Sequence, residues 1–533
     1  MGLPLENIVN FIDLPQAVAS RWPGRIEIKV DEERFRVTLT CSSVDLQELC
    51  GWLFSQQGYR LATLVVEEND SEWTIRYIFY GELGAGQIHL ITRFPLFQLT
   101  IPSISPQIHA ADWQEREIED LFGLSFEGHP RLGDFVLHEE WPDGVNPMRA
   151  SFDASEPYPH KELDADWRPQ MIVEAPGVFT MPIGPIYSDY AESAHFLLET
   201  VGEDVIRTIP RFFYKYRGVE KIAEGQSVDQ ALLLAERFSG TSAFAHSFAF
   251  CQAVEAGCGI EPPPRAKALR VLLAELERLR HHVSTIVGIC SSTALAVATS
   301  QASILEEELL RWTCRFVGHR YLFGLNIPGG LSVDLSNDEG KRMNEALWGI
   351  LEKLKKLQEM LRFTSSFLDR LEEVGIVSKD KAVSYGLVGP VARASGVSSD
   401  LRMIQPYAYY DHLKFHVPRE VEGDGYARLR VLFSEAEQAV NLIHQVSSSL
   451  PAGPINIPVE LIPGYGLGWV EAPGGAAFHW IRLGEKGRIL RYRLMTPSFV
   501  NWHGFHLAAE DFAFQDFPII MATFGLSNAE CDR

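Results

Sequence analysis

Cysteines are the residues of this 533-residue chain best suited to redox or metal chemistry, and there are seven of them. They stand at positions 41, 50, 251, 258, 290, 314 and 531, and no two have CxxC spacing. Structural zinc sites and cysteine-ligated iron–sulfur clusters take thiolates from closely spaced pairs, so the sequence favours neither. The odd number of cysteines also argues against a disulfide framework and indicates a reducing compartment such as the cytosol.

The charge distribution argues against one class of partner, nucleic acids. The formal net charge is −22, and residues 1–150 alone hold 23 acidic and 11 basic side chains. A protein that binds phosphate backbones needs a basic face, so we expect no nucleic acid partner. The first ten residues carry Glu6 and no basic cluster before an apolar run, so we expect no secretory signal.

The elements that must position any site differ between the two parts of the chain. Residues 25–101 alternate polar and apolar residues in several runs, which is typical of half-buried strands, and residues 43–57 have the spacing of an amphipathic helix. The remainder is mostly helical, with helices expected over 264–283, 337–374 and 428–450. We therefore expect an α+β chain in which a small N-terminal α/β sandwich domain precedes a large, mainly α-helical domain.

One uncharged stretch, residues 283–305, is long enough to span a bilayer. It is rich in serine and threonine, which suits close packing between helices better than contact with lipid. We predict a buried helix here and no direct transmembrane span. A segment rich in proline and acidic residues follows the first domain, which gives three parts: residues 1–150, a linker at 151–169, and 170–533.

Two motifs in the first domain carry a family resemblance. Residues 111–130, which begin Ala111-Asp-Trp-Gln-Glu-Arg-Glu-Ile-Glu-Asp, resemble the signature of the C subunit of respiratory complex I, and Pro147-Met-Arg matches the end of that module. As an amphipathic helix, the first motif would turn Trp113 inward. Its acidic residues, among them Glu115 and Glu117, would then face water or a basic partner.

The rest of the chain resembles the D subunit of complex I and, more closely, the large subunit of formate-hydrogenlyase-type membrane-bound [NiFe] hydrogenases. The matching segments include Met181-Pro-Ile-Gly-Pro, Tyr216-Arg-Gly-Val-Glu-Lys, Leu273-Ala-Glu-Leu-Glu-Arg-Leu, Val388-Gly-Pro-Val-Ala-Arg and Gly468-Trp-Val-Glu-Ala-Pro. The resemblance implies a hydrogenase-large-subunit-like fold for residues 170–533. It also implies a peripheral position on the cytoplasmic face of the inner membrane, beside a small iron–sulfur subunit and antiporter-like membrane subunits.

The metal chemistry of those hydrogenases is not carried over. Their nickel–iron centre needs four thiolates from two CxxC pairs, and thiolates are the soft ligands that such a site requires. The matching positions here hold Ser239 and Ser242 in the first segment and Ser527 and Glu530 in the second. We therefore expect no metal or other cofactor on this chain and no hydrogen activation by it, with the iron–sulfur clusters in the partner. We also expect Arg533 to be an unprocessed natural end.

The resemblance leaves two readings open for the ionisable residues. Glu220 matches a carboxylate that relays protons beside the metal, and Arg393 matches an arginine of the same cavity. With Arg217 and His246 they would form either a proton relay or a satisfied ion-pair network. His281 and His282 belong to a neighbouring motif and are expected at a solvated helix end.

A quinone site is the other alternative implied by the resemblance to complex I. Tyr187 stands at the position of a loop histidine, Val228 replaces a tyrosine, and His195 lies nearby. We therefore weigh three functions: a core subunit of a complex I-like or hydrogenase-4-like assembly that couples electron transfer or proton movement to membrane partners, a quinone-reducing subunit, and an inert structural subunit.

Overall fold

The structure is a computed structural model that describes residues 9–32, 34–81, 86–162, 176–187 and 192–533. Its contacts divide the chain into two compact units. The first comprises residues 1–174, 211–216 and 384–386, and the second comprises 175–210, 217–383 and 387–533. The sequence-based boundary falls between residues 150 and 170, and the part of the expected linker from 163 to 169 lies outside the described residues.

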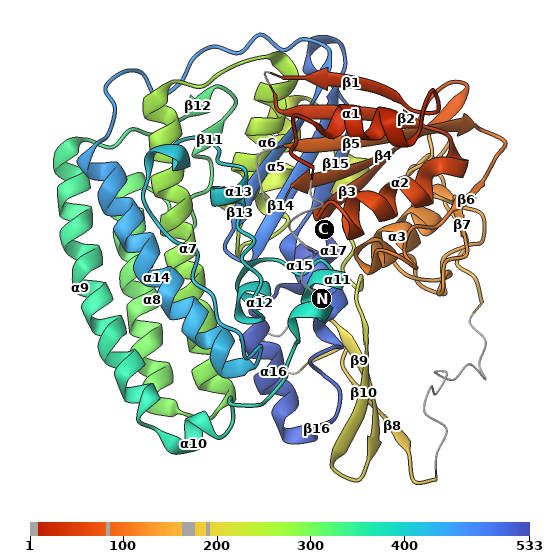
Figure 1. Cartoon of the computed structure of the whole chain (residues 1–533). Helices are drawn as coiled ribbons and strands as arrows, with labels where there is room; N and C mark the ends of the chain where they lie inside the picture. The colour runs from red at the N-terminus through yellow and green to blue at the C-terminus, as the bar shows by residue number, and fades with distance from the viewer. Residues whose placement is uncertain (1–8, 33, 82–85, 163–175, 188–191) are drawn as a thin grey trace. The chain divides into compact units, whose positions relative to one another are not determined.

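The first unit is built on a five-stranded sheet (Figure 1). Its order is β1 (Glu27–Asp31), β2 (Arg36–Cys41), β5 (Gln87–Pro95), β4 (Glu72–Gly81) and β3 (Tyr59–Glu68). Only the pair β2–β5 is parallel. Helices α2 (Ser43–Ser55) and α3 (Asp112–Phe122) both pack against β3, which explains why that strand is buried over almost its whole length.

Helix α3 carries the first of the complex I motifs and departs from the expected pattern. Trp113 is buried as predicted, but Glu115 and Glu117 are buried too, so the prediction that they face water or a partner is wrong. Glu115 accepts hydrogen bonds from the Ser103 hydroxyl at 2.5 Å and the Ile104 backbone N–H at 2.8 Å. Burial raises its pKa to about 7 even though these donors favour the ionised form.

Four long helices pack side by side in the second unit (Figure 1). They are α7 (Pro264–Ser292), α8 (Ala296–Val317), α9 (Asn337–Arg362) and α14 (Gly425–Ser448). The stretch 283–305 is therefore two helices rather than one, because the chain turns at residues 293–295. Among the described residues, no helix is both long and apolar enough to cross a membrane.

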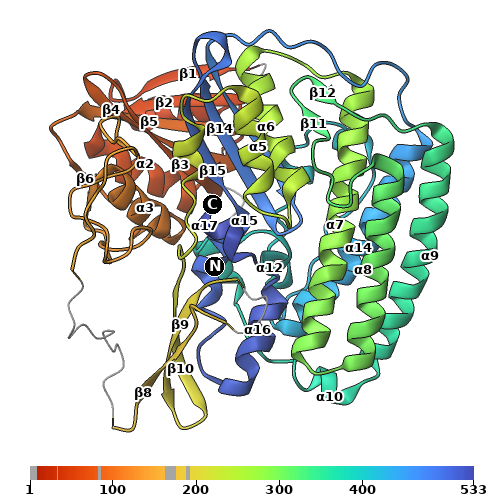
Figure 2. The ribbon, with the colours of Figure 1, turned by 180° about the vertical axis from the view of Figure 1, so that it is seen from behind.

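Beside these helices, α6 (Ala243–Cys258) packs on a three-stranded antiparallel sheet of β13 (Gly464–Ala472), β14 (Gly475–Leu483) and β15 (Ile489–Met495) (Figure 2). Gly466 and Gly468 make this close approach possible, because a Cβ at either position would collide with the backbone of α6. A second sheet has the order β16 (Phe512–Ala513), β10 (Asp204–Arg211), β9 (His195–Val201) and β8 (Phe179–Ile183).

The histidine pair of α7 corrects another prediction. His281 and His282 were expected at a solvated helix end, but α7 continues to Ser292 and both side chains are buried. His282 Nε2 lies 2.9 Å from Glu435 Oε2 on α14. Close packing of α14 against α7 buries this stretch of the helix.

Candidate functional site

The two segments that match the nickel-binding motifs come together in the second unit. Ser239 and Ser242 lie just before and at the start of α6, while Ser527 caps the short helix α17 (Asn528–Asp532), which carries Glu530. All four side chains are buried. The segments meet where His246 Nε2 on α6 lies 2.9 Å from Glu530 Oε1.

From Glu530 a chain of buried hydrogen bonds runs through α6 to the sheet. His246 Nδ1 lies 3.0 Å from His479 Nε2 on β14, and His479 Nδ1 lies 2.8 Å from the Tyr492 hydroxyl on β15. At the other end, the Ser498 hydroxyl donates to Glu530 Oε2. We call the sequence Ser498–Glu530–His246–His479–Tyr492 the histidine chain.

One arrangement of protons satisfies every bond of the histidine chain. With Glu530 ionised, His246 Nε2–H donates to it, His479 Nε2–H donates to His246 Nδ1, and the Tyr492 O–H donates to His479 Nδ1. Burial, with a smaller contribution from His246, lowers the pKa of His479 well below its ordinary value, and burial raises that of Tyr492. Both groups are therefore neutral near pH 7 in this arrangement.

The side chains at the four positions that match the nickel ligands do not fit nickel. Three are serine hydroxyls, which are hard and weakly acidic, and the fourth is a carboxylate, whereas this metal site requires soft thiolates. Ser239 Oγ lies 2.9 Å from Thr241 Oγ1, and Ser527 Oγ donates to the Glu192 carboxylate at 3.2 Å. Among the described residues, no cluster of three or more His, Cys, Asp or Glu side chains is arranged to hold a metal ion.

Glu220, on α4 (Val219–Ala223), is bound by arginines rather than placed in the histidine chain. Its carboxylate accepts from Arg491 Nη2 at 3.0 Å, Arg493 Nη1 at 3.2 Å and the Leu494 backbone N–H at 3.0 Å. Burial alone would raise the pKa of Glu220, but Arg493, Arg491 and Arg533 together hold it below the ordinary value. A carboxylate held ionised in this way accepts protons poorly.

The other predicted site residues have separate partners. Arg217 Nη1 donates to the Phe238 carbonyl at 2.6 Å, which ties α4 to the end of α5 (Val228–Arg237). The Tyr187 hydroxyl donates to the Ala194 carbonyl at 3.0 Å, next to His195 at the start of β9. The Tyr187 O–H is thus already used within the chain, which weakens the case for a quinone ligand at this residue.

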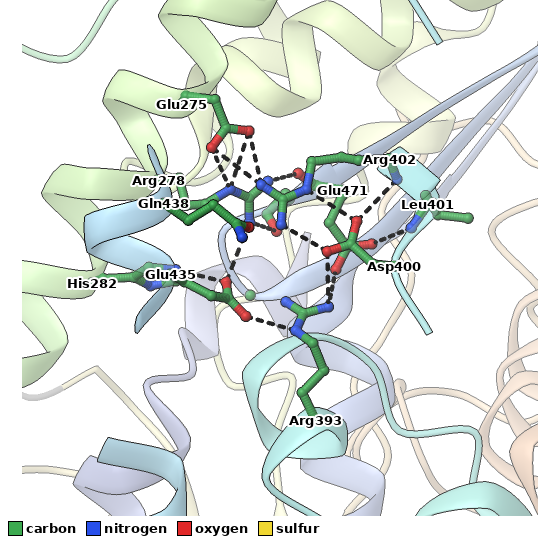
Figure 3. A network of polar contacts seen from close by, with 12 residues as sticks. Glu275, Arg278, His282, Arg393, Asp400, Leu401, Arg402, Glu435, Gln438 and Glu471 are labelled. Carbon is green, nitrogen blue, oxygen red and sulfur yellow. Dashed lines mark hydrogen bonds and ion pairs between the residues drawn. The ribbon is translucent and has the colours of Figure 1, made fainter. Parts of the chain in front are cut away.

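Arg393, on α12 (Gly389–Ala394), belongs to a second buried network, well away in sequence from α17 (Figure 3). Its guanidinium donates to Glu435 Oε1 at 2.6 Å, to Glu471 Oε1 at 2.7 Å and to the Ser399 carbonyl at 3.1 Å. We call this network the arginine–carboxylate cluster. Its members are Glu275, Arg278, His282, Arg393, Asp400, Arg402, Tyr410, Glu435 and Glu471.

The other half of the arginine–carboxylate cluster is organised by Arg402 on α13 (Leu401–Ile404). Arg402 donates to Asp400 Oδ2 at 2.7 Å and to Glu275 Oε1 at 3.0 Å, and Tyr410 donates to the same Glu275 oxygen at 2.6 Å. Arg278 Nε donates to Glu275 Oε2 at 3.2 Å. The carboxylates of Glu275 and Asp400 are each fixed by more than one donor.

Sequence reasoning missed three members of the histidine chain: His479, Tyr492 and Ser498. His479 lies in the run Gly475–Leu483, where a single histidine among apolar residues gives no spacing signal. Tyr492 and Ser498 fall within a segment that matches the hydrogenases, residues 492–502, but the match alone does not say which side chains point inward. Only the pairing of β14 with β15 places His479 beside Tyr492.

Comparisons with known proteins agree with this architecture. Residues 39–158 match the family of the 30 Kd subunit of respiratory-chain NADH dehydrogenase, residues 297–465 match that of the 49 Kd subunit, and residues 217–286 match nickel-dependent hydrogenase. These matches confirm the resemblance and the α+β fold class, with the sheet-containing domain preceding the helical one.

Relatives that match over long stretches point the same way. Formate hydrogenlyase subunit 5 of Escherichia coli (strain K12) is 29% identical over 97% of this chain and 92% of its own length. The carbon monoxide-induced hydrogenase of Rhodospirillum rubrum is 30% identical over 64% of this chain and 96% of its own length. Hydrogenase-4 component G of Escherichia coli (strain K12) is 26% identical over 97% of this chain and 92% of its own length.

Proposed function

Because this chain belongs to the family that unites the large subunits of membrane-bound hydrogenases with the C and D subunits of complex I, we propose that it is the core subunit of a complex I-like oxidoreductase without a nickel–iron centre of its own. The observation that carries the proposal is the set of side chains at the four positions that match the nickel ligands. These are three hydroxyls and one carboxylate, all buried, and three of them are in hydrogen-bond contact with other side chains of this chain. Hydrogen activation would need thiolates there.

In this proposal the chain docks an iron–sulfur subunit and works beside antiporter-like membrane subunits, peripherally on the cytoplasmic face. The family relationship supports membrane association. The partners would supply the redox centres and the membrane span. The contribution of this chain would be to hold ionisable groups in a dry interior, where proton movement can be coupled to electron transfer in the neighbouring subunit.

The histidine chain is the route we assign to that proton movement. When each bond reverses, Tyr492 gives its proton to His479, His479 gives one to His246, and His246 gives one to Glu530. Glu530 then releases a proton and Tyr492 takes one up from outside, so one proton enters at Tyr492 and one leaves at Glu530. Neutral imidazoles suit this task because each has one donor and one acceptor nitrogen. His246 thereby takes part in the relay, while Glu220 and Arg217 position the surrounding elements.

The metal content of the purified complex tests the main proposal. We expect elemental analysis to find iron from the partner subunit and no stoichiometric nickel. A formate hydrogenlyase preparation grown and purified in the same nickel-supplemented medium serves as the positive control. One nickel per chain, retained after dialysis against a chelator, would overturn the proposal.

A quinone-reducing subunit is the second candidate; it rests on the family relationship to the C and D subunits of complex I, because the Tyr187 hydroxyl already donates to the Ala194 carbonyl. The test is quinone-dependent oxidation of a low-potential donor by the intact complex. Turnover that falls at least tenfold in Tyr187→Phe, with unchanged donor oxidation by an artificial acceptor, would support a quinone site here. Unchanged quinone turnover in that variant would remove Tyr187 from such a site.

A further inference from the structure

The arginine–carboxylate cluster contains more acid groups than cations. Among the described residues it joins four carboxylates, those of Glu275, Asp400, Glu435 and Glu471, to three guanidinium groups, those of Arg278, Arg393 and Arg402. All seven side chains are essentially buried. A lone negative charge in a dry interior is costly, and such a site lowers its energy by binding a proton.

The geometry points to two positions for this proton. The first is Glu471 on β13, which shares Arg393 Nη1 with Asp400: that nitrogen lies 2.7 Å from Glu471 Oε1 and 3.6 Å from Asp400 Oδ2. Burial, with Asp400 adding to it, raises the pKa of Glu471 despite Arg393 and Arg278. Glu435, which faces Arg393 and His282, has instead a pKa held far below the ordinary range.

The second position is Nδ1 of His282, the ring nitrogen that does not face Glu435. The Nε2 atom lies 2.9 Å from Glu435 Oε2, so in the neutral ring this nitrogen carries the hydrogen and Nδ1 is left as an acceptor. Nδ1 is buried and has no hydrogen-bond partner among the described residues. Burial lowers the pKa of His282, although Glu435 opposes this shift.

Every element packed around the cluster contributes charged or titratable groups to this balance. Helix α7 supplies Glu275, Arg278, His281 and His282, α12 supplies Arg393, and α14 supplies Glu435. Asp400 and Arg402 come from the start of α13, Tyr410 from the 3₁₀ turn η3 (Tyr410–His412), Tyr407 from the preceding loop, and Glu471 from β13. Burial lowers the pKa of His281 and raises those of Tyr407 and Tyr410, so these three groups are neutral.

A surface pocket lies next to chain segments that carry Arg393 and Glu435, and no member of the cluster is among the described residues that line it. Its volume is about 450 Å³, and its lining includes Ser398, His416, Glu420 and Ser434. The Glu420 backbone N–H donates to the Arg393 carbonyl at 3.0 Å, and Ser434 precedes Glu435 on α14.

We propose that the arginine–carboxylate cluster is a proton-binding site that takes up one proton from solvent, held by Glu471 or by His282 Nδ1. Binding converts a net charge of minus one to a neutral cluster and moves no electron. The proton comes from solvent and returns there. This site is separate from the histidine chain and does not depend on the identity of the complex.

Three carboxylate variants of the full chain test the proposal. Glu471→Gln reproduces the charge of the protonated cluster, so we expect its melting temperature at pH 7 to match that of the wild type. Glu435→Gln removes the partner of both Arg393 and His282 and should lower the melting temperature by several degrees. Glu255→Gln is the matched control, because Glu255 forms a balanced buried pair with Arg270 at 2.7 Å and should also be costly to change.

Infrared difference spectra locate the proton itself. We expect the wild-type minus Glu471→Gln spectrum to contain the C=O band of a protonated carboxyl group, or the wild-type minus His282→Gln spectrum to contain an imidazolium band with ¹⁵N-histidine labelling. Neither band should be lost in Glu255→Gln. Absence of both bands between pH 5 and 8, or equal destabilisation by Glu471→Gln and Glu435→Gln, would overturn the proposal.

Discussion

Glu220 and Glu471 are both buried carboxylates beside arginines, yet their surroundings push them in opposite directions. Glu220 faces the guanidinium groups of Arg491, Arg493 and Arg533, which hold its pKa below the ordinary value. Glu471 lies in a cluster where carboxylates outnumber guanidinium groups, and its pKa is raised. The ratio of acid to base around a buried carboxylate, rather than the presence of arginine, decides whether it can carry a proton.

The comparison changes the roles expected from the family resemblance. Glu220 occupies the position of a relay carboxylate, but in this chain its arginines make it a structural anion that joins α4 to β15. We propose that proton-carrying capacity lies instead in the neutral imidazoles of the histidine chain and in the arginine–carboxylate cluster, which has an excess carboxylate. The predictions below test this division, beginning with the largest effect.

Replacing Glu220 by glutamine should be strongly destabilising. Arg491 and Arg493 would lose the charge that compensates them in a buried site, at a cost of about 3–5 kcal/mol in the free energy of unfolding. Denaturant unfolding of the full chain measures this. Glu307→Gln, which breaks an exposed pair with Arg311 and Arg320, is the control and should have little effect. If Glu220→Gln lost as little unfolding free energy as Glu307→Gln, Glu220 would not be the structural anion that the comparison with Glu471 requires.

Glu277 extends the comparison to a carboxylate held by backbone groups. It accepts from the Phe244 and Ala245 N–H groups at 2.8 and 2.9 Å, and burial raises its pKa to about 7 although Arg280 and these two donors oppose the shift. Because the folded state keeps this proton longer than the unfolded state, stability should fall as pH rises from about 4.5 to about 7. The loss attributable to Glu277 is about 3 kcal/mol.

Unfolding free energies measured across this pH range in the wild type and in Glu277→Gln check the prediction. The slope, not the absolute stability, is the test, since the amide can accept from only one of the two N–H groups and shifts every point alike. Glu115 also has a pKa raised to about 7 and contributes its own slope to both proteins. Identical slopes in the two proteins would show that Glu277 does not titrate in this range.

Much of the fold could be predicted from the sequence, because strand alternation and helical periodicity report burial directly. The end of α7 could not. Ala294 adopts φ +60° in the turn between α7 and α8, a conformation that alanine seldom takes, and neither glycine nor proline marks that turn. The prediction of one buried helix over 283–305 holds only for the part in α7, because Val297 and Ile304 of α8 are exposed. The expected end of the first helix also placed His281 and His282 in solvent.

The candidate site was predictable where it depends on motifs and unpredictable where it depends on pairing between distant elements. The motifs brought His246 and Glu530 to attention, and the structure places them in contact although 284 residues separate them. His479 and Tyr492 join them only through the register of β14 and β15. The number of arginines that face Glu220 likewise depends on which side chains of β15 point inward, and no local sequence pattern predicts that.

The smallest effect we predict is the loss of a single tyrosine hydroxyl from each network. In one network the hydroxyl donates to a charged group, and in the other it donates to a neutral group. Tyr410 donates to ionised Glu275 at 2.6 Å, whereas Tyr492 donates to neutral His479 at 2.8 Å. Charge-assisted hydrogen bonds are about twice as strong as neutral ones, so Tyr410→Phe should cost about 2 kcal/mol and Tyr492→Phe about 1 kcal/mol in unfolding free energy. Both residues are fully buried and lose the same atom, so each variant is the control for the other. Equal costs would mean that His479 is charged or Glu275 protonated, and the distinction between a neutral chain and an ionic cluster would then fail.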